Sequence, residues 1–151
     1  MSCCQQYGLY AAETGVPQGA SVSPADLQEY VDLLRESPYW QRSFPQVLRI
    51  ETFSRTADGT GSVGGWHPEL NCGTIEMAPC HHCELFILHE VAHVVSAARY
   101  GSQAHCPWFS RTYLELVSCY LPESYPALYD SFVSAGIDFE HESYVPGGIQ
   151  L

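Results

Sequence analysis

Five consecutive residues carry the strongest chemical signal in the chain: His89, Glu90, Val91, Ala92 and His93, an H-E-x-x-H motif. Residues four apart in a helix lie on the same face, so His89 and His93 can offer two imidazole nitrogens to one metal ion. Glu90 lies about 100° round the helix, where its carboxylate would contact a water on the ion rather than the ion itself. The motif predicts a zinc-binding helix with a general base beside the metal.

A catalytic zinc site needs a third protein ligand and leaves a fourth position open for water. His105 follows the motif, and Gly101 stands between them, where a helix C-cap would let the chain turn back towards the metal. Glu115 and Glu123 are alternative third ligands but lie farther along, and Glu115 could instead orient a ligand histidine from behind. The predicted site has three zinc ligands and one catalytic base: His89, His93 and His105, with Glu90.

The stretch after the motif carries a family resemblance. His105-Cys106-Pro107-Trp108-Phe109 resembles the H-G-P-x-F element that follows H-E-x-x-H in SprT-like metalloproteases, with Cys106 in place of the usual Gly. The whole chain more closely resembles a group of small metallohydrolases of actinobacteria and their phages. The similar segments occur in order: 9–13, 37–40, 44–45, 88–93 and 113–117.

This resemblance implies a zinc hydrolase, in the first place a metallopeptidase whose substrate is a protein or peptide. It carries the ligand role over to His89, His93 and His105, and the role of base to Glu90. It supplies no substrate. SprT-like proteases often act on DNA-bound proteins, but nothing in this chain resembles their basic tail or second zinc module.

Upstream of the motif, the pattern predicts one helix and three strands. Ser23 as N-cap and Pro24 as first helical residue begin a helix that ends near 36. Alternating apolar residues predict a strand over 47–54, followed by a short Gly-rich strand over 62–66 and another strand over 72–77. By analogy with zincins, residues 73–77 would form the edge along which an extended substrate lies.

The metal-site helix is apolar almost all round, as expected of a buried helix. Downstream, Pro107 is expected to start a helix that Pro122 ends, and 126–135 predicts a last helix capped by Gly136. The residues at the two ends, 1–8 and 143–151, are expected to be loose. The predicted fold is a single zincin-like α+β domain over 1–151: a small, mostly antiparallel sheet packed on the metal-site helix, with N-terminal and C-terminal helices.

The net charge and the distribution of apolar residues indicate which classes of partner the chain is expected to bind. The formal net charge is −11, and the six basic residues are all Arg. Such an acidic surface repels phosphate backbones, which makes a nucleic-acid partner an unfavoured choice. The chain has neither an apolar run long enough to span a bilayer nor a signal-peptide pattern, so we expect it in the cytoplasm of a bacterium or phage-infected cell.

A second candidate metal site precedes the metal helix, at Cys80-His81-His82-Cys83. The C-x-x-C spacing suits a zinc knuckle, which needs four ligands. The alternative is a loop with surface histidines and reduced thiols, since seven cysteines without a secretion signal predict thiols or ligands rather than disulfides. We expect Cys80, Cys83 and Cys106 to be free thiols outside the first metal's shell. Three other residues could complete the knuckle: Cys72, Cys106 or His67.

Two functions fit this pattern. In a hydrolase, zinc would lower the pKa of its water to about 7, and Glu90 would take the proton and deliver it to the leaving amine. A tyrosine such as Tyr100, Tyr113 or Tyr144 could stabilise the developing charge. In a zinc-stabilised binding module, for example a phage protein that sequesters a host factor, no base is needed. The intact Glu90 favours the hydrolase.

Overall fold

The computed structural model describes residues 11–56, 61–101 and 105–139. The terminal segments that were predicted to be loose, 1–8 and 143–151, lie outside these ranges. Across the described part of the chain, no helix is long and apolar enough to cross a membrane.

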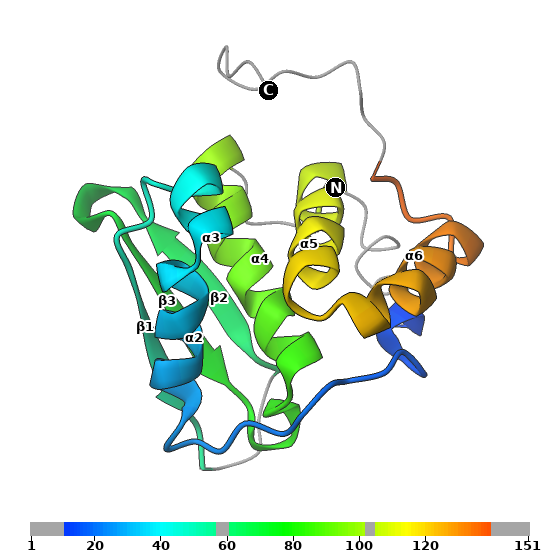
Figure 1. Cartoon of the computed structure of the whole chain (residues 1–151), viewed down its shortest axis with the longest axis horizontal. Helices are drawn as coiled ribbons and strands as arrows, with labels where there is room; N and C mark the ends of the chain where they lie inside the picture. Colours follow the sequence, from blue (N-terminus) through cyan, green and yellow to red (C-terminus); the bar gives the residue numbers. More distant parts are fainter. Residues whose placement is uncertain (1–10, 57–60, 102–104, 140–151) are drawn as a thin grey trace.

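The architecture is α+β, as predicted, with helices packed against a three-stranded sheet. Figure 1 shows the sheet on one side of the molecule, with α4 (Glu84–Tyr100) crossing it and α5 (Pro107–Tyr120) beyond α4. Helix α4 packs against β2 and β3 on one side and against α5 on the other. The helix that carries the H-E-x-x-H motif is therefore the central layer of the fold.

The sheet is mixed rather than mostly antiparallel. Its strands β1 (Arg49–Ser54), β2 (Val63–His67) and β3 (Cys72–Met77) follow the order β1-β3-β2. Strand β3 pairs antiparallel with β2 but parallel with β1, so the prediction of a mostly antiparallel sheet is wrong for the second pair. The prediction that 73–77 forms the substrate-facing edge is also wrong, because β3 is the central strand.

A tight turn explains this order. The 3-10 turn Pro68–Leu70 and the left-handed Asn71 (φ 47°) reverse the chain directly between β2 and β3, which makes these strands antiparallel neighbours. Strand β1 then occupies the opposite side of β3 and runs parallel to it. The edge strand that packs against the metal-site helix is β2.

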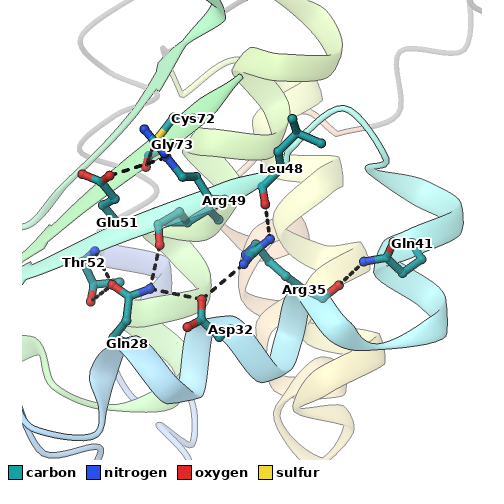
Figure 2. A network of polar contacts seen from close by, with 11 residues as sticks. Gln28, Asp32, Arg35, Gln41, Leu48, Arg49, Glu51, Thr52, Cys72 and Gly73 are labelled. Carbon is teal, nitrogen blue, oxygen red and sulfur yellow. Dashed lines mark hydrogen bonds and ion pairs between the residues drawn. The ribbon is translucent and has the colours of Figure 1, made fainter. Parts of the chain in front are cut away.

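Helix α2 (Leu27–Glu36) covers the other edge of the sheet. The side-chain amide of Gln28 donates to the carbonyl of Ile50 at 2.8 Å and accepts from the N–H of Thr52 at 2.9 Å, as Figure 2 shows. A strand edge exposes unpaired backbone groups, and these two bonds satisfy such groups on β1.

The first helices start slightly differently from the prediction. The helix expected from Pro24 begins at Leu27, and the residues before it form a turn closed by the N–H of Asp26, which donates to Ser23 Oγ at 3.2 Å. Ser37 ends α2, as predicted, and then caps a short helix α3 (Pro38–Ser43) by accepting from the N–H of Trp40.

Glycines bring α4 unusually close to the sheet. A Cβ atom added at Gly64 on β2 would lie 2.4 Å from the carbonyl oxygen of Glu90 and 3.1 Å from Cβ of His93. A Cβ atom at Gly73 on β3 would lie 2.3 Å from Val94 Cγ1. Only residues without a side chain fit at these two contacts, so the Gly-rich strand fixes the depth of the metal-site helix.

The helix ends follow the sequence signals. Helix α4 ends at Gly101, whose left-handed backbone (φ 76°) accommodates the predicted C-cap. Pro107 is the first residue of α5, and the helix ends at Tyr120, before Pro122. Helix α6 (Tyr125–Ser134) precedes Gly136, which is also left-handed (φ 68°).

Candidate metal centre

The three predicted histidines converge on one point between α4 and α5. The Nε2 atom of His105 lies 3.1 Å from Nε2 of His89 and 2.9 Å from Nε2 of His93. All three residues are buried, with 2 %, 9 % and 4 % exposure for His89, His93 and His105. Within the described residues, they are the one group of three potential ligands whose donor atoms all lie within 4.8 Å of one another.

This cluster fits a divalent metal ion. Nitrogens bound tetrahedrally to zinc at about 2.0–2.1 Å lie about 3.3 Å apart, close to the spacing seen here. Burial, together with the neighbouring His89, lowers the pKa of His105 to about 3, so its ring stays neutral and keeps a lone pair for a metal. Three buried imidazole nitrogens facing each other need a cation or shared protons between them, and zinc satisfies all three.

A phenylalanine forms the floor of the cluster. The ring of Phe109 stacks on His93 with a centroid distance of 4.3 Å, and it contacts His105 at 4.8 Å and His89 at 5.1 Å. Phe109 is fully buried and lies one helical turn after His105, across Pro107. The His-x-Pro-x-Phe spacing therefore places an apolar ring that excludes water beneath the three imidazoles.

Glu13 contacts the histidine cluster, and the sequence analysis assigned it no role. Both carboxylate oxygens lie 3.0 Å from His89 Nδ1, and the hydroxyl of Tyr113 donates to Oε2 at 2.9 Å. Burial alone would lower the pKa of His89, but the charge and hydrogen bond of Glu13 raise it overall. An Nδ1–H that donates to Glu13 leaves the lone pair of His89 on Nε2, facing the cluster, as metal-binding histidines require.

The other acidic candidates lie elsewhere. Glu115 accepts from the hydroxyl of Tyr39 at 2.5 Å and pairs with Arg99 at 3.6 Å, so it neither joins the cluster nor orients a ligand. Glu123 is exposed in the turn after α5. The predictions of Glu115 and Glu123 as alternative ligands, and of Glu115 behind a ligand, are wrong, because Glu115 is paired with Tyr39 and Arg99 and Glu123 lies in the exposed turn Pro122–Ser124.

Of the tyrosines considered as oxyanion donors, Tyr113 is placed behind the cluster. Its hydroxyl is committed to Glu13 and to the carbonyl of Leu85, at 2.9 and 3.3 Å. Tyr100 packs beside Trp108 at the end of α4, with a centroid distance of 6.1 Å. Tyr144 lies outside the described residues.

Weakening the contact of Glu13 gives the first testable prediction. In Glu13→Gln the amide holds His89 less strongly and no longer supplies a negative charge, so we expect zinc affinity to fall about 10–100-fold. Competition with a chelator of known affinity measures the change. Glu36→Gln, an exposed position at the end of α2, is the control. An unchanged zinc affinity in Glu13→Gln would show that the carboxylate of Glu13 does not support the binding of the metal by His89.

Glu90 is buried beside the cluster and faces a cavity. Its side chain is 5 % exposed, and its Oε2 atom has no hydrogen-bond partner within the described part of the chain. Burial raises the pKa of Glu90 to about 7, although the nearby His89 opposes the shift. The cavity has a volume of about 380 Å³, and the described residues that line it are Gly61, Ser62, His81, Phe86, His89 and Glu90.

The buried carboxyl makes the stability of the metal-free protein depend on pH. Because the pKa of Glu90 rises from 4.5 to about 7 on folding, the free energy of unfolding falls as pH increases between these values. We expect metal-free Glu90→Gln to lack this loss. The free energy of unfolding of the variant minus that of wild type should therefore be larger at pH 8 than at pH 4.5, by up to about 3 kcal/mol. Thermal unfolding of both proteins at the two pH values measures the difference. A difference that is the same at both pH values would contradict the shift.

The cysteine–histidine segment before α4 does not gather into a cluster of three ligands in the described part of the chain. Cys80 is exposed and Cys83 is buried, and both are free thiols, as is Cys106 beside the third histidine. Two residues that could have completed a knuckle have other partners: Cys72 accepts from Arg49, and His67 contacts Thr74. Whether these thiols stay outside a metal shell in solution remains a prediction.

No protein-family model, curated protein or solved structure matches the chain. The resemblance to SprT-like and related metallohydrolases accordingly rests on the sequence segments that carry it.

Proposed function

We propose that the protein is a metal-dependent hydrolase, in the first place a zinc peptidase. The observation that carries this proposal is the buried carboxyl of Glu90, whose Oε2 atom has no hydrogen-bond partner among the described residues, beside three converging imidazoles and an adjoining cavity. Leaving a buried carboxylate oxygen without a partner costs stability, and such groups persist where a reaction needs them. A binding module that used the metal only for stability would have no use for this arrangement.

The residues divide into three roles. A zinc ion held by His89, His93 and His105 would supply Lewis-acid polarisation of a carbonyl and activation of water. Glu90 would accept a proton from the attacking water and return it to the leaving nitrogen. Glu13 orients His89 and fixes which of its nitrogens faces the metal.

The number of ligands also supports a catalytic site. Structural zinc sites are closed by four protein ligands, whereas catalytic sites use three and keep one position for water or substrate. In the part of the chain that the structure describes, the cluster holds three ligands and no fourth. The neighbouring thiol of Cys106 is buried but is not part of the group.

A peptide substrate suits the sheet edge beside the cavity. Gly61 and Ser62, which line the cavity, lead directly into the edge strand β2. An extended peptide can add to a sheet edge through backbone hydrogen bonds. A peptide aligned with β2 would pass the cavity at Glu90, so the edge expected for 73–77 is assigned to β2 in this proposal.

Removal and return of the metal test the proposal. Wild-type protein is incubated with a library of unstructured peptides, and cleavage is followed by mass spectrometry. We expect cleavage that disappears after dialysis against a chelator and returns with one equivalent of zinc. Absence of cleavage by zinc-loaded protein across the library, or cleavage that persists without metal, would refute the proposed function.

A further inference from the structure

His81 shares a cavity with Glu90 and has no role in the site described so far. It comes from the 3-10 turn Pro79–His81, which precedes α4, and it lines the same 380 Å³ cavity as Glu90 and His89. The sequence places it in the cysteine–histidine segment, but the structure separates its environment from that of the cysteines. Cys80 and Cys83 line a different pocket, together with His82.

The ring of His81 is held in one orientation. Its Nδ1 atom lies 2.9 Å from Ser62 Oγ, and its ring centroid lies 5.0 Å from that of Phe86. Contacts on one nitrogen and along the ring restrict rotation, so the nitrogen left for a ligand is Nε2. A polar group that is fixed before the substrate arrives loses little freedom when it binds.

Ser62 offers His81 a donor that favours one position of the ring proton. Its hydroxyl oxygen accepts from the N–H of Ala78 at 2.8 Å, and its hydrogen remains available to be donated to His81 Nδ1. With Nδ1 as the acceptor, the proton of the neutral ring is on Nε2. Burial lowers the pKa of His81, which favours this neutral form.

We propose that His81 is a catalytic residue that donates an Nε2–H hydrogen bond to the substrate carbonyl oxygen as negative charge develops on it. This inference rests on the proposed function and extends it, because it assigns the side chain opposite the base. No proton is transferred in this step: the hydrogen bond strengthens as the carbonyl carbon is attacked, and it weakens again when the carbonyl reforms. The role that sequence reasoning gave to a tyrosine thus belongs to a histidine.

Three variants separate this role from a structural one. His81→Phe keeps a ring against Phe86 but removes the donor, whereas His81→Gln retains an N–H near the position of Nε2. His82→Gln changes the adjacent histidine, which faces the other pocket, and serves as the matched control. Each zinc-loaded protein is assayed on the best peptide from the library, with zinc content and thermal unfolding as checks on folding.

We expect kcat of His81→Phe to fall by about 10²–10³-fold with KM changed by less than about threefold. His81→Gln should recover at least about tenfold of this loss. A phosphonamidate analogue of the peptide, which mimics the tetrahedral transition state, provides a readout that does not depend on turnover. Its dissociation constant, measured by calorimetry, should rise in His81→Phe in parallel with the fall in kcat/KM, and it should be unchanged in His82→Gln.

Two outcomes would overturn the inference while leaving the proposed function intact. One is a His81→Phe protein that cleaves the peptide and binds the phosphonamidate as wild type does. The other is a rise in KM with kcat unchanged, which would indicate that His81 binds the substrate and the transition state equally well. If His81→Phe fails to fold, Ser62→Ala decides the matter, because it releases Nδ1 and should lower kcat while His82→Gln does not. Failure of zinc-loaded wild-type protein to cleave any peptide, or cleavage that persists without metal, would instead refute the proposed function itself.

Discussion

Glu90→Gln is expected to lower kcat for peptide hydrolysis by about 10²–10⁴-fold, the usual contribution of a general base. The substitution preserves the size of the side chain and removes its ability to accept a proton. Because Glu90 is not one of the three converging ligands, zinc content should remain at one equivalent. The loss should therefore appear in kcat for protein that is fully loaded and folded.

The matched control is Glu123→Gln, an exposed carboxylate that sequence spacing alone left open as a ligand. We expect it to retain wild-type kcat and zinc content. Stopped assays on the library peptide and metal analysis of the same samples give both quantities. Chelator-sensitive cleavage that proceeds at the wild-type rate in Glu90→Gln would remove Glu90 from the mechanism.

His105→Ala should have the largest effect on the metal. It removes the nitrogen that lies within 3.1 Å of both other Nε2 atoms, and the two remaining histidines, four residues apart, form an incomplete site. We expect zinc affinity to fall by more than the 10–100-fold typical of losing an outer-shell partner, with loss of turnover. Stabilisation by zinc, about 2.7 kcal/mol at 100 times the dissociation constant, should disappear at the same concentration.

The neighbouring residue provides the control for this variant. Cys106→Ser is conservative in size and lies directly after His105, outside the group of ligands. We expect it to bind one equivalent of zinc with unchanged affinity, measured by chelator competition alongside His105→Ala. Zinc retained by His105→Ala but lost by Cys106→Ser would reverse the assignment of the third ligand.

Local patterns predicted the part of the site that depends on local geometry. His89, Glu90 and His93 share one helix, and their relative positions follow from 3.6 residues per turn once that helix is recognised. His105 could be predicted as a ligand from the sequence because a helix cap and a proline define a short connection around it. Gly101 and Pro107 take these roles in the structure.

Long-range contacts explain what sequence reasoning missed. Glu13 meets His89 across 76 positions of the chain, and no spacing rule relates two residues that approach through separate elements. The signal that was available is a carboxylate next to small, apolar residues, Ala11 and Ala12, in a segment that resembles the metallohydrolases. An acidic residue in such a setting is expected to be paired when it is buried.

The order of the strands could not be predicted from the sequence for the same reason. Alternating side chains identified the three strands, but they do not state which strand pairs with which. The left-handed Asn71 after Pro68 is the local feature that joins β2 to β3 as antiparallel neighbours. Similarly, His81 looked like part of a cysteine cluster until its contact with Ser62, nineteen positions away, became visible.

X-ray absorption at the zinc edge of wild-type protein, purified without added metal, identifies the atoms that bind the metal. We expect one zinc per chain with three imidazole nitrogens and one further nitrogen or oxygen donor, all at about 2.0–2.1 Å. Three imidazoles would identify the site formed by His89, His93 and His105. A sulfur neighbour at about 2.3 Å would contradict the account, because it would place a cysteine in the position that a water and substrate must share.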